Sequence, residues 1–203
     1  MKPNFREGLN WKRFTFLHPF GLLSFSMITF GIMSPQAQAV GAFEIQIEPI
    51  VGYEQVQQVI PTPHTNTRLF YGARAIAGLP LIALEAQFTR GMSQETFGTS
   101  SQTNTGDRAK VGLRSSFRLS SMIWLFLRAG GEAALEKVVQ VDNGVTTTTE
   151  FPIRYSPYAG TGARFWLTNK ISATADVVAV FADVNDLRKT EFQATAGFAL
   201  RLP

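Results

Sequence analysis

Residues 43–54, FEIQIEPIVGYE, alternate in character with a period of two. One parity is apolar and aromatic and consists of Phe43, Ile45, Ile47, Val51 and Tyr53. The other parity carries Glu44, Gln46, Glu48, Gly52 and Glu54. This period is typical of a β-strand with two unlike faces. In a soluble sheet the polar face meets water, whereas in a membrane barrel it faces the lumen and the apolar face contacts lipid.

The same alternation recurs along the chain, and no segment after residue 39 shows helical periodicity. The predicted strands are 43–54, 67–77, 81–90, 108–117, 122–141, 146–166, 171–182 and 190–202. The connections after the second, fourth and sixth strands are short, and those after the first, third and fifth are longer. These longer polar segments are predicted to be outward-facing loops at 55–66, 92–107 and 139–150, the last built around the hairpin signal Asn143-Gly144.

Short turns at one end and longer connections at the other are typical of outer-membrane barrels. The absence of an apolar run of about 18 residues after residue 39 excludes a spanning helix there, so a membrane-spanning chain must close into a barrel. We therefore predict an all-β fold, an eight-stranded antiparallel up-and-down transmembrane β-barrel with short periplasmic turns and longer extracellular loops.

The first 39 residues are predicted to be a cleaved signal peptide, which leaves residues 40–203 as the barrel. They combine a basic start, an apolar run over 14–33 and the small-residue ending Ala37-Gln38-Ala39. This segment holds four of the 19 Lys and Arg residues and one of the 15 Asp and Glu residues, so the remainder is close to neutral. The charge therefore predicts no nucleic-acid partner. The chain has no cysteine, which excludes a disulfide framework.

Charged strand residues fall almost entirely on the polar parity, with Arg90 and Lys137 as exceptions near strand ends. Acids and bases are balanced there, as a closed lumen requires, because an unpaired buried ion is very costly. Two predicted neighbour pairs are Arg74 with Glu85 and Glu44 with Arg201. The predicted lumen ion-pair network consists of Glu44, Glu48, Arg74, Glu85, Lys110, Arg114, Arg128, Glu132, Arg164, Asp176 and Arg201.

Several sequence features together resemble the small outer-membrane β-barrel family of the OmpA and OmpX kind. They are the leader ending in Ala37-Gln38-Ala39, the pairs Glu48-Pro49 and Gly52-Tyr53, the stretch 157–167 and the alternating final strand 192–202. The resemblance implies a Gram-negative outer membrane and assembly by the barrel-insertion machinery. The final strand of this family usually ends in an aromatic residue. This chain departs from that pattern, because it ends in Leu202-Pro203 and its last aromatic residue is Phe198.

Candidate chemistry is sparse. His64 is the one histidine after residue 39, and no Ser or acid partner stands out beside it, so no catalytic set is predicted. With one histidine and no cysteine, the sequence predicts no transition-metal site. It also contains no glycine-rich phosphate-binding motif, so no cofactor is predicted. The chain is accordingly not expected to be an enzyme.

Three functions stay open from the sequence. The first is an integral outer-membrane barrel with a structural or surface-interaction role, its lumen plugged by the Arg/Glu network. The second is a narrow pore or small-solute channel. The third is a soluble periplasmic lipocalin-like lipid carrier, which would require the apolar face to point inward.

The expected partners are outer-membrane lipid and lipopolysaccharide and, during assembly, the insertion machinery. The barrel itself is expected to be a monomer. The threonine run 146–149 is an exposed strand edge that could also serve adhesion by strand pairing.

Overall fold

The computed structural model describes residues 43–58, 64–97, 100–142, 144–183 and 189–202. The predicted signal peptide, residues 1–39, lies outside the described residues. Nine antiparallel strands make up the described fold: β1 Glu44–Gln58, β2 His64–Leu79, β3 Ile82–Phe97, β4 Ser100–Arg118, β5 Ile123–Asp142, β6 Val145–Glu150, β7 Arg154–Trp166, β8 Ile171–Phe181 and β9 Thr190–Leu202. Among the described residues, no helix is long and apolar enough to cross a membrane.

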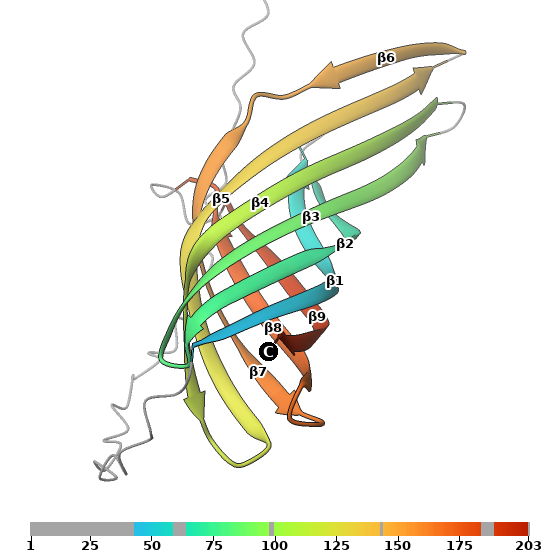
Figure 1. Cartoon of the computed structure of the whole chain (residues 1–203). Coiled ribbons are helices and arrows are strands. Elements are labelled where there is room, and N and C mark those ends of the chain that lie inside the picture. The colour runs from blue at the N-terminus through green and yellow to red at the C-terminus, as the bar shows by residue number, and fades with distance from the viewer. Residues whose placement is uncertain (1–42, 59–63, 98–99, 143, 184–188, 203) are drawn as a thin grey trace, which may run out of the picture. The chain divides into compact units, whose positions relative to one another are not determined.

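Eight of the nine strands close into a ring (Figure 1). Each strand pairs with its neighbour in sequence, β7 follows β5 directly in the ring, and β9 pairs with β1 to close it. The strand β6 is the exception, because it pairs with β5 beyond the point where β7 leaves off. Together β6 and β7 cover the predicted strand 146–166, which is interrupted at residues 151–153. The predicted eight-stranded antiparallel barrel is therefore confirmed.

One end of the barrel carries three short turns, and we call it the turn end. They connect β2 to β3, β4 to β5 and β7 to β8, as the sequence predicts. Hydroxyl groups stabilise two of these turns: Ser120 Oγ accepts a hydrogen bond from the Ile123 amide at 3.0 Å, and Thr168 Oγ1 accepts one from the Ile171 amide at 3.0 Å. The opposite end, which we call the hairpin end, carries the connections that the sequence predicts to be longer.

The conformation of the longer connections differs from the prediction. Residues 92–107, predicted as a polar loop, are mostly strand, because β3 runs to Phe97 and pairs with β4 from Ser100 onward. Likewise, β1 and β2 extend into the predicted loop 55–66. The hairpin predicted from Asn143-Gly144 is confirmed, because β5 pairs with β6 there and Gly144 has a φ of +82°. In 55–58, 64–66 and 93–106 both strand faces are mostly polar, so the alternation that identifies a strand disappears there.

These extended strands form a sheet that continues beyond the ring (Figure 1). It consists of residues 93–97 of β3, 100–106 of β4, 137–142 of β5 and the whole of β6, and we call it the protruding sheet. Pairing of β3 with β2 stops at Leu69 and Met92, so β3 has a strand neighbour on one side only within this sheet, among the described residues. The strand β6 likewise pairs only with β5. Among the described residues, β3 and β6 are therefore the edge strands of the protruding sheet.

The ring places its apolar side chains outside and its polar side chains inside. Large apolar residues are exposed along every ring strand, for example Val51, Tyr71, Leu84, Val111 and Phe198. Most of the buried side chains are charged or amide-bearing. At the hairpin end the apolar belt stops at polar outward residues such as Gln55, Thr67, Arg90 and Lys137. Within the belt, no described outward-facing residue is charged.

Candidate functional site

The lumen is the most chemically distinctive part of the described structure. Nine of the predicted network residues are buried inside it: Glu48, Arg74, Glu85, Lys110, Arg114, Arg128, Glu132, Arg164 and Asp176. The other two, Glu44 and Arg201, are partly exposed at the turn end. Strand alternation explains this placement, because every second residue of a ring strand points inward.

The buried charges form two clusters with no ion pair between them among the described residues. The turn-end cluster contains Arg74, Arg114, Arg128, Arg164, Arg201, Glu44, Glu48, Glu85 and Asp176. The hairpin-end cluster contains Arg68, Arg108, Lys110, Arg154, Glu54, Glu132, Glu136 and Glu191.

Arg74 is the centre of the turn-end cluster. Its guanidinium lies 2.9 Å from Asp176, 3.3 Å from Glu48 and 3.8 Å from Glu85, and all four side chains are almost fully buried. Arg128 contacts two of the same acids, Glu85 and Asp176. These partners come from β1, β3, β5 and β8 around the ring, so the contacts cross the lumen rather than follow one strand pair. The cluster therefore ties together strands that share no backbone hydrogen bonds.

Arg108 has the same role in the hairpin-end cluster. Its guanidinium contacts four acids, namely Glu54 at 2.8 Å, Glu191 at 3.0 Å, Glu136 at 3.4 Å and Glu132. A second base in this cluster, Lys110, lies 3.0 Å from Glu132. Such a cluster offsets the cost of removing each charge from water only when most of its hydrogen-bonding groups are satisfied. The four acids around Arg108 meet that condition in large part.

The structure brings together both residue pairs that the sequence singles out. Arg201 Nη2 lies 2.9 Å from Glu44 Oε1, where β9 closes on β1. Arg74 Nε lies 3.8 Å from Glu85, but the two residues are diagonal, because Arg74 stands directly opposite Gln87 in the β2–β3 register. The Gln87 side chain occupies the nearer position and accepts hydrogen bonds from Arg74 at 3.1 Å and from Arg128 at 2.8 Å.

Sequence reasoning missed several members of the network. Arg108 shares the parity of Lys110 but stands at the boundary of a predicted loop, so its inward position was not recognised. Gln193 lies on the predicted polar face without a predicted partner, yet its amide bridges Lys110, Glu54 and Glu132. Parity alone would have identified Arg108, whereas the bridging role of Gln193 depends on contacts across the lumen.

Two glycines make room for one of the long side chains. A Cβ atom added at Gly106 would lie 2.1 Å from Arg68 Nη2, and one added at Gly91 would lie 2.9 Å from Arg68 Nε. The guanidinium of Arg68 therefore lies against the bare backbone of β3 and β4 while it contacts Glu54 and Glu136. Glycine at these two positions leaves the space that the guanidinium of Arg68 occupies in the network.

The outward-facing charges lie above the apolar belt, and each is paired. Arg90 makes two hydrogen bonds of 2.7 Å to Asp107, an outward acid that the sequence reading did not single out. This hydrogen bonding lowers the pKa of Asp107. Lys137 donates a hydrogen bond of 2.8 Å to Glu150, and this hydrogen bond lowers the pKa of the exposed Glu150 carboxyl. Pairing at this height keeps the charged groups next to water and away from the belt.

The described residues contain no group of three or more His, Cys, Asp and Glu side chains arranged to hold a metal ion. The side chain of His64 lies outside the described part of the structure. The Arg and Glu side chains of the lumen mostly form ion pairs with one another. The chemical role that this arrangement supports is to neutralise charge and to fill the interior of the barrel.

Comparisons with known proteins identify the fold. No family model matches the sequence, and no curated protein matches it. The attachment invasion locus protein Ail of Yersinia pestis superimposes with a TM-score of 0.55 at 13% identity, covering 78% of this chain and 98% of that chain. Neisserial surface protein A superimposes with a TM-score of 0.52 at 13% identity, covering 79% and 97% of the two chains. A major outer membrane protein of Thermus thermophilus gives 0.55 at 11% identity, covering 79% and 100%. The chain thus has the fold of the small outer-membrane barrels, as the sequence resemblance implies.

Proposed function

We propose that this chain is an integral outer-membrane barrel with a structural or surface-interaction role and a lumen closed by its two ion clusters. The observation that carries the proposal is the inverted distribution of side chains. Val111 on the outer face is 64% exposed, whereas Glu48 in the lumen is 0% exposed. An aqueous solvent would favour the opposite arrangement, while lipid outside a closed sheet favours this one.

The same distribution argues against a soluble lipid carrier of lipocalin type. Such a carrier needs an apolar cavity, but the lumen of this barrel holds most of the buried charges of the described chain. Outer-membrane lipid, with lipopolysaccharide in its outer leaflet, is the partner that the apolar belt fits, and assembly by the insertion machinery follows from the same proposal. A monomer suffices, because the ring is closed and leaves no strand of the belt unpaired.

The narrow-pore alternative is disfavoured by the lumen contacts. Arg74 and Arg108 each contact at least three acids drawn from different parts of the ring, so side chains cross the lumen at two levels. An eight-stranded ring has room for little more than its own side chains. In planar bilayers we expect conductance no greater than leak. Discrete channels that persist in the purified protein would favour the pore instead.

The protruding sheet is the feature that supports a surface-interaction role. It extends from the hairpin end beyond the belt, and its β6 strand is exposed along its whole length. Its edge strand β6 pairs only with β5 among the described residues, so an extended partner segment could add to the outer side of β6. The structural neighbour Ail is named for attachment and invasion, and a contact role for this sheet is the corresponding proposal for the present chain.

The test of membrane insertion compares two matched Arg substitutions on the outer face of β4. Val111→Arg places a charge in the belt, where it costs about 2–4 kcal/mol at mid-depth. Thr103→Arg places the same charge eight residues away on the outer face of the protruding sheet. We expect heat-modifiable, folded barrel in the outer-membrane fraction to fall for Val111→Arg and to stay at the wild-type level for Thr103→Arg. Equal recovery of both variants would contradict a lipid-facing belt.

A further inference from the structure

The two ion clusters differ in their charge balance. Among the described residues, the hairpin-end cluster contains four acids and four bases. The turn-end cluster contains five bases but only four acids. The turn end of the lumen therefore carries one positive charge more than its own side chains neutralise.

The excess charge resides on Arg114 and Arg164. The acids nearest Arg114 are Glu48 and Glu85, both 3.7 Å from Nη1, and neither makes a hydrogen bond with it. Arg114 instead lies with its guanidinium carbon 3.4 Å from the centre of the Phe126 ring. Arg164 has no acid within 4.0 Å among the described residues. Both arginines are at least nine-tenths buried.

Several buried hydrogen-bond donors at this end also lack a partner. They are all three guanidinium nitrogens of Arg114, Nε and Nη2 of Arg164, Nε of Arg201, the indole Nε1 of Trp166 and the hydroxyl of Ser172. Buried donors without a partner are rare in folded proteins, and each one costs free energy. These donors outnumber the acceptors of the same region that make no hydrogen bond, which are Gln46 Oε1 and single oxygens of Glu48, Glu85 and Asp176, and the Asp176 oxygen already lies in an ion pair with Arg74 at 2.9 Å.

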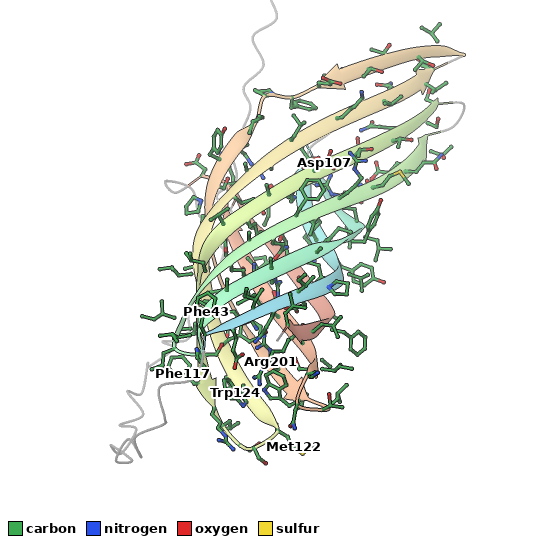
Figure 2. The ribbon with its side chains drawn as sticks, in the orientation of Figure 1. Phe43, Asp107, Phe117, Met122, Trp124 and Arg201 are labelled. Atoms are coloured by element: carbon green, nitrogen blue, oxygen red, sulfur yellow. The ribbon has the colours of Figure 1, made fainter. Side chains whose placement is uncertain are left out.

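The donors come from strands that meet at the turn end. Arg164 stands opposite Thr174 and Trp166 opposite Ser172 in the β7–β8 register, so Ser172 lies diagonally next to Arg164. Arg114 lies over the Phe126 ring, and Phe126 stands opposite Gly162, which is two residues from Arg164 on the same face of β7, so both arginines belong to this end of the lumen. Arg201 lies over the Trp166 ring at 4.4 Å and is partly exposed, and Figure 2 shows Arg201 and Trp124 at this end of the barrel.

We propose that the turn end of the lumen binds a small oxyanion of the phosphate or sulfate class between Arg114, Arg164 and Ser172. Its entry lies past Arg201 and Trp166. The oxygens of a tetrahedral oxyanion accept several hydrogen bonds at once and match the planar donors of a guanidinium. Water could satisfy the same donors but could not neutralise the surplus charge, which is costly to leave unpaired in a buried site.

The test is a titration of the detergent-solubilised full chain with inorganic phosphate at constant ionic strength, held with sodium chloride. Trp124 and Trp166 lie at the entry, with ring centres 6.2 Å apart, so their fluorescence reports binding directly. The wild-type chain should show a saturable change and a raised thermal unfolding midpoint. Arg164→Gln should weaken phosphate binding about tenfold or more, since it removes a charge-assisted partner.

Arg154→Gln is the matched control, because Arg154 lies on the same strand but belongs to the hairpin-end cluster. It should bind phosphate with wild-type affinity. If Arg164→Gln does not fold, Ser172→Ala, which keeps every charge, should bind phosphate several-fold more weakly. Wild-type affinity in Arg164→Gln, or in Ser172→Ala in its place, would overturn the proposal.

A second titration, with a short-chain phosphatidic acid, separates two sources of the same chemistry. A response to inorganic phosphate identifies a free oxyanion as the ligand. A response only to phosphatidic acid, with the same dependence on Arg164, identifies a lipid headgroup. Both outcomes support the site. The absence of a saturable response in both titrations would overturn it, and it would leave the proposed membrane role untouched, because insertion depends on the outer face.

Discussion

Replacing Arg74 by leucine should destabilise the barrel strongly. Its guanidinium contacts Glu48, Glu85 and Asp176, all buried, and the substitution leaves these three carboxylates with one fewer cation between them. Breaking a buried ion pair by removing one partner costs about 3–5 kcal/mol, much of it from the acids left behind. With a urea dependence of about 2 kcal/mol per molar, the unfolding midpoint should fall by about 2 M.

The assay is urea unfolding in lipid vesicles, followed by tryptophan fluorescence and by heat modifiability on gels. Arg154→Leu is the control, because Arg154 is also inward-facing but is partly exposed and contacts a single acid, Glu191, at 2.7 Å. Because Arg154 is partly exposed and the buried Glu191 keeps its contact with Arg108, losing this pair should cost about 1 kcal/mol or less. Combining Arg74→Leu with Glu48→Gln should cost less than the sum of the two single changes, because it also removes one of the stranded charges. Equal midpoints for Arg74→Leu and the wild-type chain would refute a stabilising lumen network.

Two further predictions concern single positions in and above the network. Gly106→Ala should lower the free energy of unfolding by about 1–3 kcal/mol, because the new Cβ would overlap the guanidinium of Arg68. Gly131→Ala is the control, because its new Cβ would meet nothing within 4 Å and the change should be nearly neutral. The urea midpoints of the two variants check this. Because hydrogen bonding from Arg90 lowers the pKa of Asp107, their pair contributes stability above the carboxyl's ordinary pKa of 3.8, and this contribution is lost as the pH falls through the lowered value. Asp107→Asn should remove that contribution, which is small for so exposed a pair, so the urea midpoints of the two chains should converge as the pH falls below the lowered pKa of Asp107; a gap that does not change with pH would contradict the assignment.

Sequence alternation predicts the ring well because the belt and the lumen differ so sharply in polarity. Along β4, the inward positions Lys110 and Arg114 alternate with the outward positions Val111 and Leu113, and this contrast identifies the strand and both of its faces. In the protruding sheet the contrast vanishes. Gln102 and Thr103 point to opposite faces, yet both are polar, so the pattern resembles a loop although the backbone pairs as strand.

The partners of each lumen charge were only partly predictable. A pair at a ring closure, such as Glu44 with Arg201, follows from the order of the strands. The contact between Arg74 on β2 and Asp176 on β8 does not follow from it, because these strands are not neighbours in the ring. Such a contact depends on the diameter of the barrel and on how far each side chain reaches, which a strand-by-strand pattern does not contain.

The network also explains why the strands keep one register. A slip of one residue exchanges the two faces of a strand. On β4 the exchange would turn Arg108, Lys110 and Arg114 from the lumen to the lipid side. A base at mid-depth costs about 2–4 kcal/mol and less toward the interfaces, so the slip would cost several kcal/mol before the loss of any ion pair is counted. An apolar lumen of equal volume could match the stability of the ion clusters, but it would offer no such penalty, because both faces of each strand would then tolerate lipid. The buried charges of this barrel therefore specify its register as well as fill its interior.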